Sequence, residues 1–260
     1  KGYAFVEFLS PCPTNWRMDA LKAADFVTQE MERVFPLGCF RDHTAKPAAA
    51  PSPIAIKDLT ALMQGSEGGI DPVPDPKFKE RHMKFSGFGG QGVLSLGLVV
   101  AEAAGRGGRY VSWFPSYGPE QRGGAASASV VIGGKEIGSP AVDAPDLLVA
   151  MNQPSLEKFL PTVVKGGTVL FEGSVPLRPA APPGVTLRPF PAMRIAEESG
   201  TPKAANTAFL GAMVELGLLG MPEADVLAAL DASFSEKPAL VERNRKVYEA
   251  AKAWVRNGRG

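Results

Sequence analysis

The sequence predicts an α/β protein whose main domain is a Rossmann-like, mostly parallel sheet flanked by helices. Short apolar segments rich in β-branched residues alternate with helical patterns over residues 83–260. The connections between these segments are short, as in a doubly wound sheet. A glycine-rich stretch, "GFGGQG", follows the first strand pattern of this region and precedes its first helical pattern. Together these three observations predict the fold class.

The expected elements of residues 83–260 follow from the periodicity of their apolar residues. A strand at "MKFS" leads through the glycine turn into the helix "VLSLGLVVAEAAGRG", which ends at glycine. The remaining elements are, in order, a strand "RYVSWFPSY", a hairpin of "ASASVVIGG" and "KEIGS" around a Gly-Gly turn, a strand "APDLLVAMN", a helix "QPSLEKFLPTV", strands "GGTVLFEGSV" and "GVTLRPFP", a helix "AMRIAEESG" and three C-terminal helices.

Residues 1–44 predict a short strand–loop–helix piece. "YAFVEFL" has the aromatic and β-branched content of a strand, and the prolines of "SPCPTN" end it. "WRMDALKAADFVTQEMERVF" has the apolar spacing of an amphipathic helix. Residues 45–82 are rich in Pro, Ala and Gly and predict a linker between two modules. Because a domain rarely begins inside its own sheet, we expect residues 1–44 to be the C-terminal fragment of a longer domain.

Composition excludes several classes of function. The 260 residues are 45% hydrophobic and carry a formal net charge of +1, so there is no basic excess for nucleic acid. No apolar run approaches the ~18 residues that a membrane span needs. Two cysteines are too few for a disulfide framework and suit a reducing, cytoplasmic compartment, and no signal peptide is visible.

The glycine loop raises three alternatives. It has the strand-to-helix position that points backbone amides at an anion, but "GVL" replaces the Lys-Ser/Thr of a Walker loop. A dinucleotide site also needs an acidic residue after the second strand, and none occurs before Glu120. The loop is therefore a tight turn that binds nothing, a site for a phosphate-bearing ligand such as coenzyme A, or a nicotinamide or flavin site. Its glycines are Gly87, Gly89, Gly90 and Gly92.

A second polar cluster follows the strand "RYVSWFPSY". If that strand lies beside the first one, the loop after it lies close to the glycine loop, where open α/β sheets bind ligands. Arg122 precedes two glycines and offers a guanidinium that suits a carboxylate or a phosphate. An internal ion pair with Glu120 is an equal alternative. The cluster consists of Tyr117, Glu120, Gln121 and Arg122.

Cys12 lies between two prolines, on a stiff turn. From its type alone it is a small buried hydrophobe. One cysteine does not make a metal site, and Cys39 lies about 27 residues further on, beyond a helix. No Ser-His-Asp or Cys-His arrangement and no paired carboxylates stand out in the sequence.

Residues 83–260 resemble the gamma subunit of the 2-oxoacid:ferredoxin oxidoreductases. The resemblance rests on "GFGGQGV" at 87–93, "SYGPEQRGG" at 116–124, "GSPAVDAPDLLVAMNQPSLEKFLP" at 138–161 and "NTAFLGAM" at 206–213. Residues 1–44 separately resemble the C-terminal end of the beta subunit, which binds thiamine diphosphate, through "GYAFVEFLSPCPTNW" and "FPLGCFRD". The chain thus resembles a beta–gamma fusion that lacks most of its beta part.

The resemblance implies the oxidative decarboxylation of a 2-oxoacid, with coenzyme A, to an acyl-coenzyme A, CO2 and reduced ferredoxin. It places thiamine diphosphate, Mg²⁺ and [4Fe–4S] clusters outside the gamma domain, so the isolated chain is expected to be inactive and without cofactor. It makes Cys12 a candidate fourth ligand of a [4Fe–4S] cluster in the intact complex only. The resemblance leads us to expect 2-oxoglutarate or a branched-chain acid as the 2-oxoacid, and "SPCPTNW" favours the former.

The partners that the resemblance implies are an alpha-type subunit, the remainder of the beta subunit, a ferredoxin-like delta subunit and ferredoxin as acceptor. It makes the glycine loop and Arg122 candidates for contacting coenzyme A phosphates or partner carboxylates. The candidate residues are Gly87, Gly89, Gly90, Gln91, Gly92, Tyr117 and Arg122. A stand-alone NAD- or FAD-binding oxidoreductase domain and a pure assembly scaffold remain the alternatives.

Overall fold

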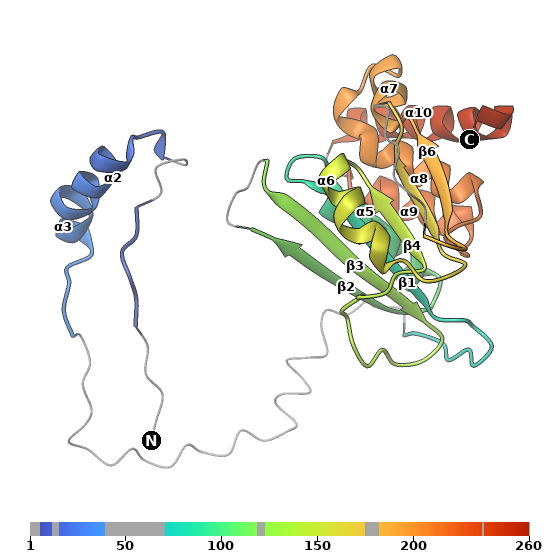
Figure 1. Ribbon diagram of the computed structural model, residues 1–260, viewed down its shortest axis with the longest axis horizontal. Helices are drawn as coiled ribbons and strands as arrows, with labels where there is room; N and C mark the ends of the chain where they lie inside the picture. Colours follow the sequence, from blue (N-terminus) through green and yellow to red (C-terminus); the bar gives the residue numbers. More distant parts are fainter. Residues whose placement is uncertain are drawn as a thin grey trace, which may run out of the picture. The chain divides into compact units, whose positions relative to one another are not determined.

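The computed structural model describes residues 6–11, 16–39, 71–118, 123–174, 182–235 and 237–259. The chain divides into two compact units, Lys1–Glu67 and Gly68–Gly260. Figure 1 shows the elements of both units.

The larger unit is built on a six-stranded sheet with the strand order β2-β3-β1-β4-β5-β6. Strands β1, β4, β5 and β6 run parallel to one another, whereas β3 is antiparallel to both β1 and β2. The sheet is therefore mixed and mostly parallel, as predicted. Its strands are β1 (Arg81–Phe88), β2 (Tyr110–Tyr117), β3 (Ala125–Gly133), β4 (Leu147–Ala150), β5 (Thr168–Glu172) and β6 (Thr186–Phe190).

Helices cover both faces of this sheet. Side chains of α5, α7, α8, α9 and α10 join the main apolar core on one face, whereas Leu156 of α6 packs in a smaller cluster on the other. The β2–β3 hairpin lies on the side of the sheet away from the C-terminal helices (Figure 1). The helices are α5 (Val93–Arg106), α6 (Gln153–Phe159), η2 (Leu160–Thr162), α7 (Ala192–Glu198), η3 (Pro202–Ala204), α8 (Ala205–Glu215), α9 (Glu223–Ala232), α10 (Pro238–Trp254) and η4 (Val255–Arg259).

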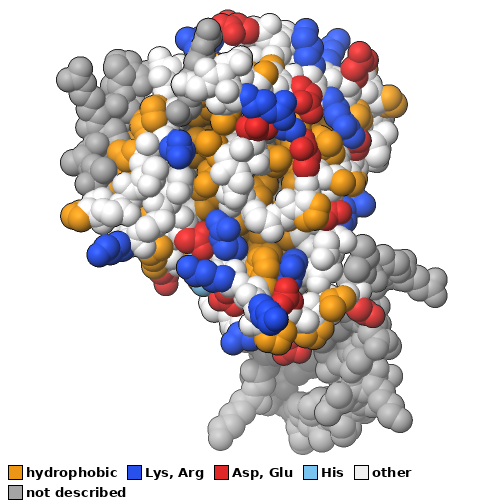
Figure 2. Space-filling model, turned by 90° about the vertical axis from the view of Figure 1, so that its right-hand side faces the viewer, with side chains coloured by type: hydrophobic (Ala, Val, Ile, Leu, Met, Phe, Trp, Pro, Cys, Tyr) orange, Lys and Arg blue, Asp and Glu red, His pale blue; other side chains and the backbone are white. Residues whose placement is uncertain are grey.

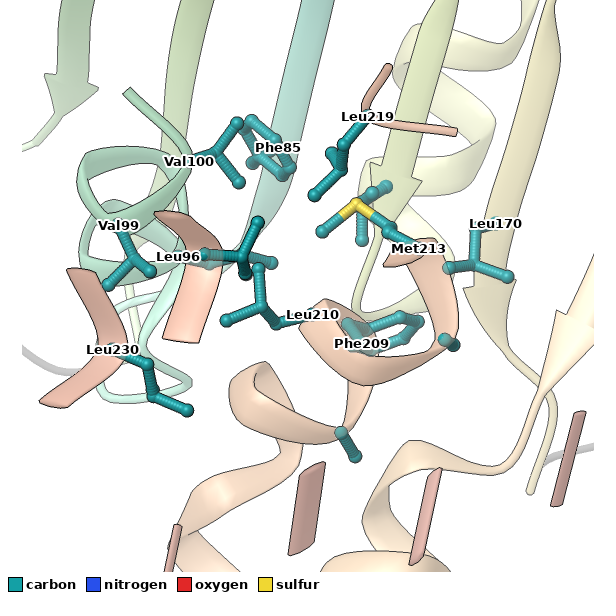
Figure 3. Packing of buried hydrophobic residues seen from close by; sticks show 14 of the residues in the cluster. Phe85, Leu96, Val99, Val100, Leu170, Phe209, Leu210, Met213, Leu219 and Leu230 are labelled. Atoms are coloured by element: carbon teal, nitrogen blue, oxygen red, sulfur yellow. The ribbon is translucent and has the colours of Figure 1, made fainter. Parts of the chain in front are cut away.

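The main core lies between the sheet and the helices α5 and α8. Phe85 of β1, Leu96 of α5 and Met213 of α8 point into one apolar layer (Figure 3). Phe209 of α8 is 1% exposed, and its ring packs 5.7 Å from that of Phe190, between centroids. Gly211 allows α8 to approach α10 closely, because a Cβ there would lie 2.4 Å from the carbonyl oxygen of Tyr248. The alternation of strand and helix patterns thus produced the expected layers.

One expectation about strand pairing is wrong, and one condition considered for the second strand is not met. The segment "KEIGS" does not pair with "ASASVVIGG": β3 ends at Gly133, and its partners are β1 and β2. Gly134 instead packs against the residues before β1, because Asp75 N donates to its carbonyl oxygen at 2.8 Å. Strand β2 also does not lie beside β1, since β3 is inserted between them. Strand partners depend on contacts distant in sequence, and a local pattern does not contain them.

Residues 71–80, which composition assigned to the linker, pack on the larger unit. Val73 N donates to the carbonyl oxygen of Gly108 at 2.8 Å. The Arg109 guanidinium bonds to Asp75 at 2.7 Å and lies 4.2 Å from the Phe78 ring centroid. These contacts place the start of this unit well before residue 83, and β1 itself begins at Arg81. Residues 71–80 are therefore part of the larger unit and lead into β1.

The smaller unit contains the expected helix but no strand among its described residues. The helix consists of α2 (Ala20–Phe26), the π-turn η1 (Val27–Met31) and α3 (Glu32–Val34). Asp19 caps its start by accepting from Lys22 N at 2.9 Å. Residues 6–9 of the expected strand "YAFVEFL" have no strand pairing, since a strand needs a hydrogen-bonded partner that the described part of this unit does not supply.

The surface around the C-terminal helices carries both signs of charge. Basic and acidic side chains are interspersed on the face shown in Figure 2. Several form pairs, such as Arg245 with Asp231 at 2.5 Å and Arg256 with Glu215 at 2.8 Å. Within the described ranges, none of the helices has both the length and the apolar character that crossing a bilayer requires.

Candidate functional site

The glycine loop, residues 87–92, lies at the carboxyl end of β1 and leads into α5. The neighbouring strand β4 is parallel to β1, so its carboxyl end lies at the same edge of the sheet. The chain leaves β1 through α5 on one face and leaves β4 through α6 on the other. In open α/β sheets this change of face between two adjacent parallel strands creates the crevice in which ligands bind.

The Gln91 side chain occupies this crevice. Its Oε1 accepts from Phe88 N at 2.7 Å and from Asn152 Nδ2 at 3.1 Å. Its Nε2 donates to the carbonyl oxygen of Met151 at 3.3 Å. Gln91, predicted as a candidate ligand contact, therefore makes its hydrogen bonds inside the protein, between the ends of the two strands.

The glycines of the loop have different structural reasons. A Cβ on Gly87 would lie 2.7 Å from Gln91 Oε1, and a Cβ on Gly92 would lie 2.6 Å from Asn206 Nδ2. Both positions therefore favour glycine, because neighbouring side chains occupy the space of a Cβ. Gly90 has φ +98°, and no atom of the described residues lies within 4 Å of the place that a Cβ would occupy. Among the described residues, its backbone forms the open rim of the loop, without a covering side chain.

The glycines after Arg122 pack directly against the loop. Gly89 N donates to the carbonyl oxygen of Gly124 at 2.8 Å, and Gly123 N donates to that of Gly89 at 3.2 Å. The expected proximity of the two glycine segments is therefore present, although β3 rather than β2 is the neighbour of β1. Arg122 itself lies outside the described residues, together with Glu120 and Gln121.

Tyr117 lies on the wall of a pocket next to the loop. The pocket, of about 290 Å³, is floored by serines of β1, β2 and β3, and Lys158 and Phe159 of α6 form the opposite wall. Tyr117 itself is 67% exposed. Deeper along the same sheet face, Lys84 Nζ donates to Ser129 Oγ at 2.9 Å. Burial lowers the pKa of the Lys84 ammonium, with Asp143 opposing and Lys158 adding to that effect.

No side chain of the described residues caps the start of α5. Gly92 adopts the left-handed conformation there, and its carbonyl oxygen accepts from Leu96 N at 2.9 Å. Asn206, at the start of α8, donates to the same carbonyl oxygen at 3.4 Å. The first amides of α5 therefore form a partly positive end at the loop, which chemically suits a phosphate or a carboxylate.

Two asparagines at this edge of the sheet were not predicted from the sequence as site residues. Asn152 caps α6 by accepting from Ser155 N at 2.9 Å and also contacts Gln91. The pattern "NQPS", an asparagine two residues before a proline, is a recognisable helix start and contained this signal. Asn206 contacts a residue 114 positions earlier, so no local pattern could reveal its role.

The described residues do not provide a site for an iron–sulfur cluster. Within the described ranges no group of three or more His, Cys, Asp or Glu side chains is placed to hold a metal ion. Cys39 is an exposed, free cysteine. Cys12, the candidate cluster ligand, lies outside the described residues.

Known proteins resemble this chain in sequence and in fold. Residues 82–254 match the family model "Pyruvate ferredoxin/flavodoxin oxidoreductase". Ketoisovalerate oxidoreductase subunit VorA of Methanothermobacter thermautotrophicus is 47% identical over 98% of this chain, which spans 54% of VorA. 2-Oxoglutarate synthase subunit KorC of Methanothermobacter marburgensis is 34% identical over 68% of this chain and 98% of its own length.

Among solved structures, the gamma subunit of a keto/oxoacid ferredoxin oxidoreductase from Geobacter sulfurreducens has a TM-score of 0.56 and 30% identity, over 66% of this chain and 96% of its own. The family match covers the sheet from the second residue of β1 onward, the glycine loop and nearly all of the C-terminal helices. The VorA match extends through both units. The chain therefore belongs to the pyruvate ferredoxin/flavodoxin oxidoreductase family and is related to subunits of the 2-oxoacid:ferredoxin oxidoreductases.

Proposed function

We propose that the chain is a gamma-type component, joined to the end of a thiamine-diphosphate-binding beta-type domain, of a 2-oxoacid:ferredoxin oxidoreductase. The observation that carries this proposal is the 47% identity with VorA across 98% of the chain. KorC matches only 68% of the chain, yet nearly all of KorC is covered. A relative of about the size of the larger unit is thus a separate chain. The match to VorA supports the interpretation that the remaining residues are part of another module.

The complex would convert a 2-oxoacid and coenzyme A to an acyl-coenzyme A, CO2 and reduced ferredoxin. The name of VorA favours 2-oxoisovalerate, a branched-chain acid, over the 2-oxoglutarate that "SPCPTNW" favoured. We assign thiamine diphosphate, Mg²⁺ and the [4Fe–4S] clusters to the partner subunits, as the family resemblance implies, with Cys12 as a candidate fourth ligand in the complex.

The role we propose for the larger unit is to contact coenzyme A at the rim of the glycine loop. Gly90 offers open backbone, and the uncapped start of α5 adds partial positive charge to the same loop. The chain continues from Gly123 back to Arg122, whose guanidinium would pair with a phosphate. In this proposal the loop positions the coenzyme and performs no bond-making step.

The test is reconstitution with matched glycine variants. The chain, fused to the upstream half of VorA and co-expressed with the other subunits, should reduce a viologen dye in the presence of coenzyme A and 2-oxoisovalerate. Gly90→Val should raise the KM for coenzyme A at least tenfold and leave that for the 2-oxoacid unchanged. Gly217→Val is the control: it has φ +66° and, among the described residues, the same open surroundings, but it follows the end of α8. The next residue, Leu218, accepts from Arg81 at the start of β1, at the end of that strand opposite the loop.

Three outcomes would contradict parts of this proposal. Dye reduction by the 260-residue chain alone would show that it is a catalyst in its own right. A complex that works equally well without this chain would remove its role. If Gly90→Val and Gly217→Val change the coenzyme A KM alike, the loop acts only as scaffold.

A further inference from the structure

Gln91 lies where β1 and β4 separate. The parallel ladder between them pairs Ser86 with Ala150 and continues through the bond from Met151 N to the carbonyl oxygen of Ser86, at 2.8 Å. If the strands kept this register, the next bond would run from Phe88 N to the carbonyl oxygen of Met151. Instead, the two groups bond to the two ends of the Gln91 side-chain amide. The amide is thus inserted into the ladder at the point where the crevice opens.

The residue type fits this position closely. Phe88 N–H can only donate and the Met151 carbonyl can only accept, so the inserted group must both accept and donate. Asn152 Nδ2 adds a second donor to Gln91 Oε1, and Asn152 Oδ1 is itself held by Ser155 N. A glutamate would set a carboxylate against the Met151 oxygen, and an aliphatic side chain would leave both backbone groups without partners.

The amide also fills the space that a phosphate would need. Gln91 Oε1 lies 2.7 Å from the place of a Cβ on Gly87, so the side chain rests directly on the first glycine of the loop. It already takes the Phe88 N–H, a donor that the first turn of a dinucleotide-binding loop would aim at the ligand. A pyrophosphate could enter this crevice only by displacing Gln91.

We propose that Gln91 is a specificity-determining residue that closes the crevice between β1 and β4 against dinucleotide phosphates. The loop keeps the G-x-G-x-x-G spacing but holds its own side-chain amide where a nicotinamide or flavin cofactor would place its pyrophosphate. This inference does not depend on the coenzyme A contact proposed at Gly90, which lies on the open rim of the loop.

The experiment is calorimetric titration of the full chain with inorganic pyrophosphate and with NADH. Wild-type protein should give no saturable heat with NADH at millimolar concentration, and any binding of pyrophosphate at the open rim sets the reference. Gln91→Ala, which empties the space and frees Phe88 N–H, should bind pyrophosphate at least tenfold more tightly than the wild type. Gln91→Met, which keeps the volume filled, should bind pyrophosphate as the wild type does. Gln153→Ala is the matched control, since Gln153 follows Asn152 but bonds outward to Glu157.

The outcomes separate clearly. Saturable binding of NADH to the wild type, or a folded Gln91→Ala protein that binds pyrophosphate no more tightly than the wild type, overturns the proposal. Binding to Gln91→Met as tight as to Gln91→Ala overturns the role of the filled volume. If Gln91→Ala does not fold, amide exchange of the wild type decides: Phe88 N–H should be protected, and 10-fold molar excesses of pyrophosphate should leave its exchange rate unchanged. A rate that responds to pyrophosphate would show that the crevice is accessible.

Discussion

The two units of this chain bury their apolar side chains to very different degrees. The larger unit encloses aromatic and aliphatic residues from its strands and helices, many of them fully buried. In the described part of the smaller unit, Ala23 alone is a buried hydrophobic residue. Phe8 is 83% exposed, Leu21 is 80% exposed and Leu37 is 70% exposed. The helices of both units have apolar periodicity. Only those of the larger unit pack against a described apolar surface.

The difference shows that an amphipathic pattern predicts a helix without guaranteeing its burial. A helix of this length gains most of its stability from a facing apolar surface. The chain spans only 54% of VorA, whose remaining length holds further residues. We therefore expect the apolar side chains of the smaller unit to be covered in the complete assembly, and the predictions that follow probe this contrast.

The largest expected effect is in the core of the larger unit. Phe209→Ala removes a ring that is 1% exposed and packs against Phe190. It should lower the free energy of unfolding by about 3–5 kcal/mol, because the removed ring leaves a cavity. Leu21→Ala is the control in the other unit and should change it by less than about 0.5 kcal/mol. Denaturant unfolding measures both, and equal losses would contradict the contrast.

A smaller loss is expected from an ion pair between α9 and α10 in which the lysine is buried and the glutamate is partly exposed. Lys252 is 4% exposed, and its ammonium bonds to Glu223, which also accepts from Tyr248 Oη at 3.0 Å. Glu223→Gln would leave this ammonium without its counter-charge and should cost about 2–3 kcal/mol at neutral pH. Glu242→Gln, at an exposed position of α10, is the control and should cost almost nothing.

This pair also predicts how stability depends on pH. The hydrogen bond from Lys252 is the main cause that lowers the pKa of Glu223 below its usual value, and burial opposes it. The stabilisation is therefore complete above the unfolded-state pKa of about 4.5 and is lost as the pH falls through the lowered folded-state pKa. The difference between wild type and Glu223→Gln should shrink over that acidic range. A difference that stays constant to pH 2 would argue against the pair.

Most elements of the larger unit could be predicted from the sequence because they depend on local chemistry. Glycine ends α5 at Gly107, and the apolar runs of β4 and β5 mark buried parallel strands. The position of β3 was not predictable in this way. Its residues pair on both sides with partners that lie up to about 50 positions away, and a single sequence does not reveal those partners.

Only part of the site could be predicted from the sequence, for the same reason. Gly87 and Gly92 mark the turn, but the neighbours that require them, Gln91 and Asn206, were not identifiable as such. Gln91 was predicted as a ligand contact because it lies within the glycine loop. Whether a side chain points outward or back between two strands depends on how far those strands separate, which only the folded sheet determines.

A still smaller effect is expected at Lys84, which lies on the sheet face covered by α6. Burial lowers the pKa of its ammonium below 10.5, so the folded state holds this proton less tightly than the unfolded state. The wild type should therefore gain stability relative to Lys84→Met as the pH rises from the lowered pKa towards 10.5. Paired denaturation curves at pH 7 and pH 10 test this. Lys79→Met, at an exposed position, should show no such change.

The smallest effect in this chain, and the sharpest test of the contrast, is at Leu21. Leu21→Asp should leave the unfolding of the 260-residue chain unchanged, because the side chain is 80% exposed there. In a chimera that adds the upstream half of VorA, the same change should lower the unfolding free energy, since a carboxylate would enter an apolar contact. Lys22→Asp, on an exposed and polar neighbouring position, should be tolerated in both proteins. If Leu21→Asp is equally silent in the chimera, the exposed apolar side chains of the smaller unit have another partner, and the beta-type assignment of residues 1–44 loses its main physical support.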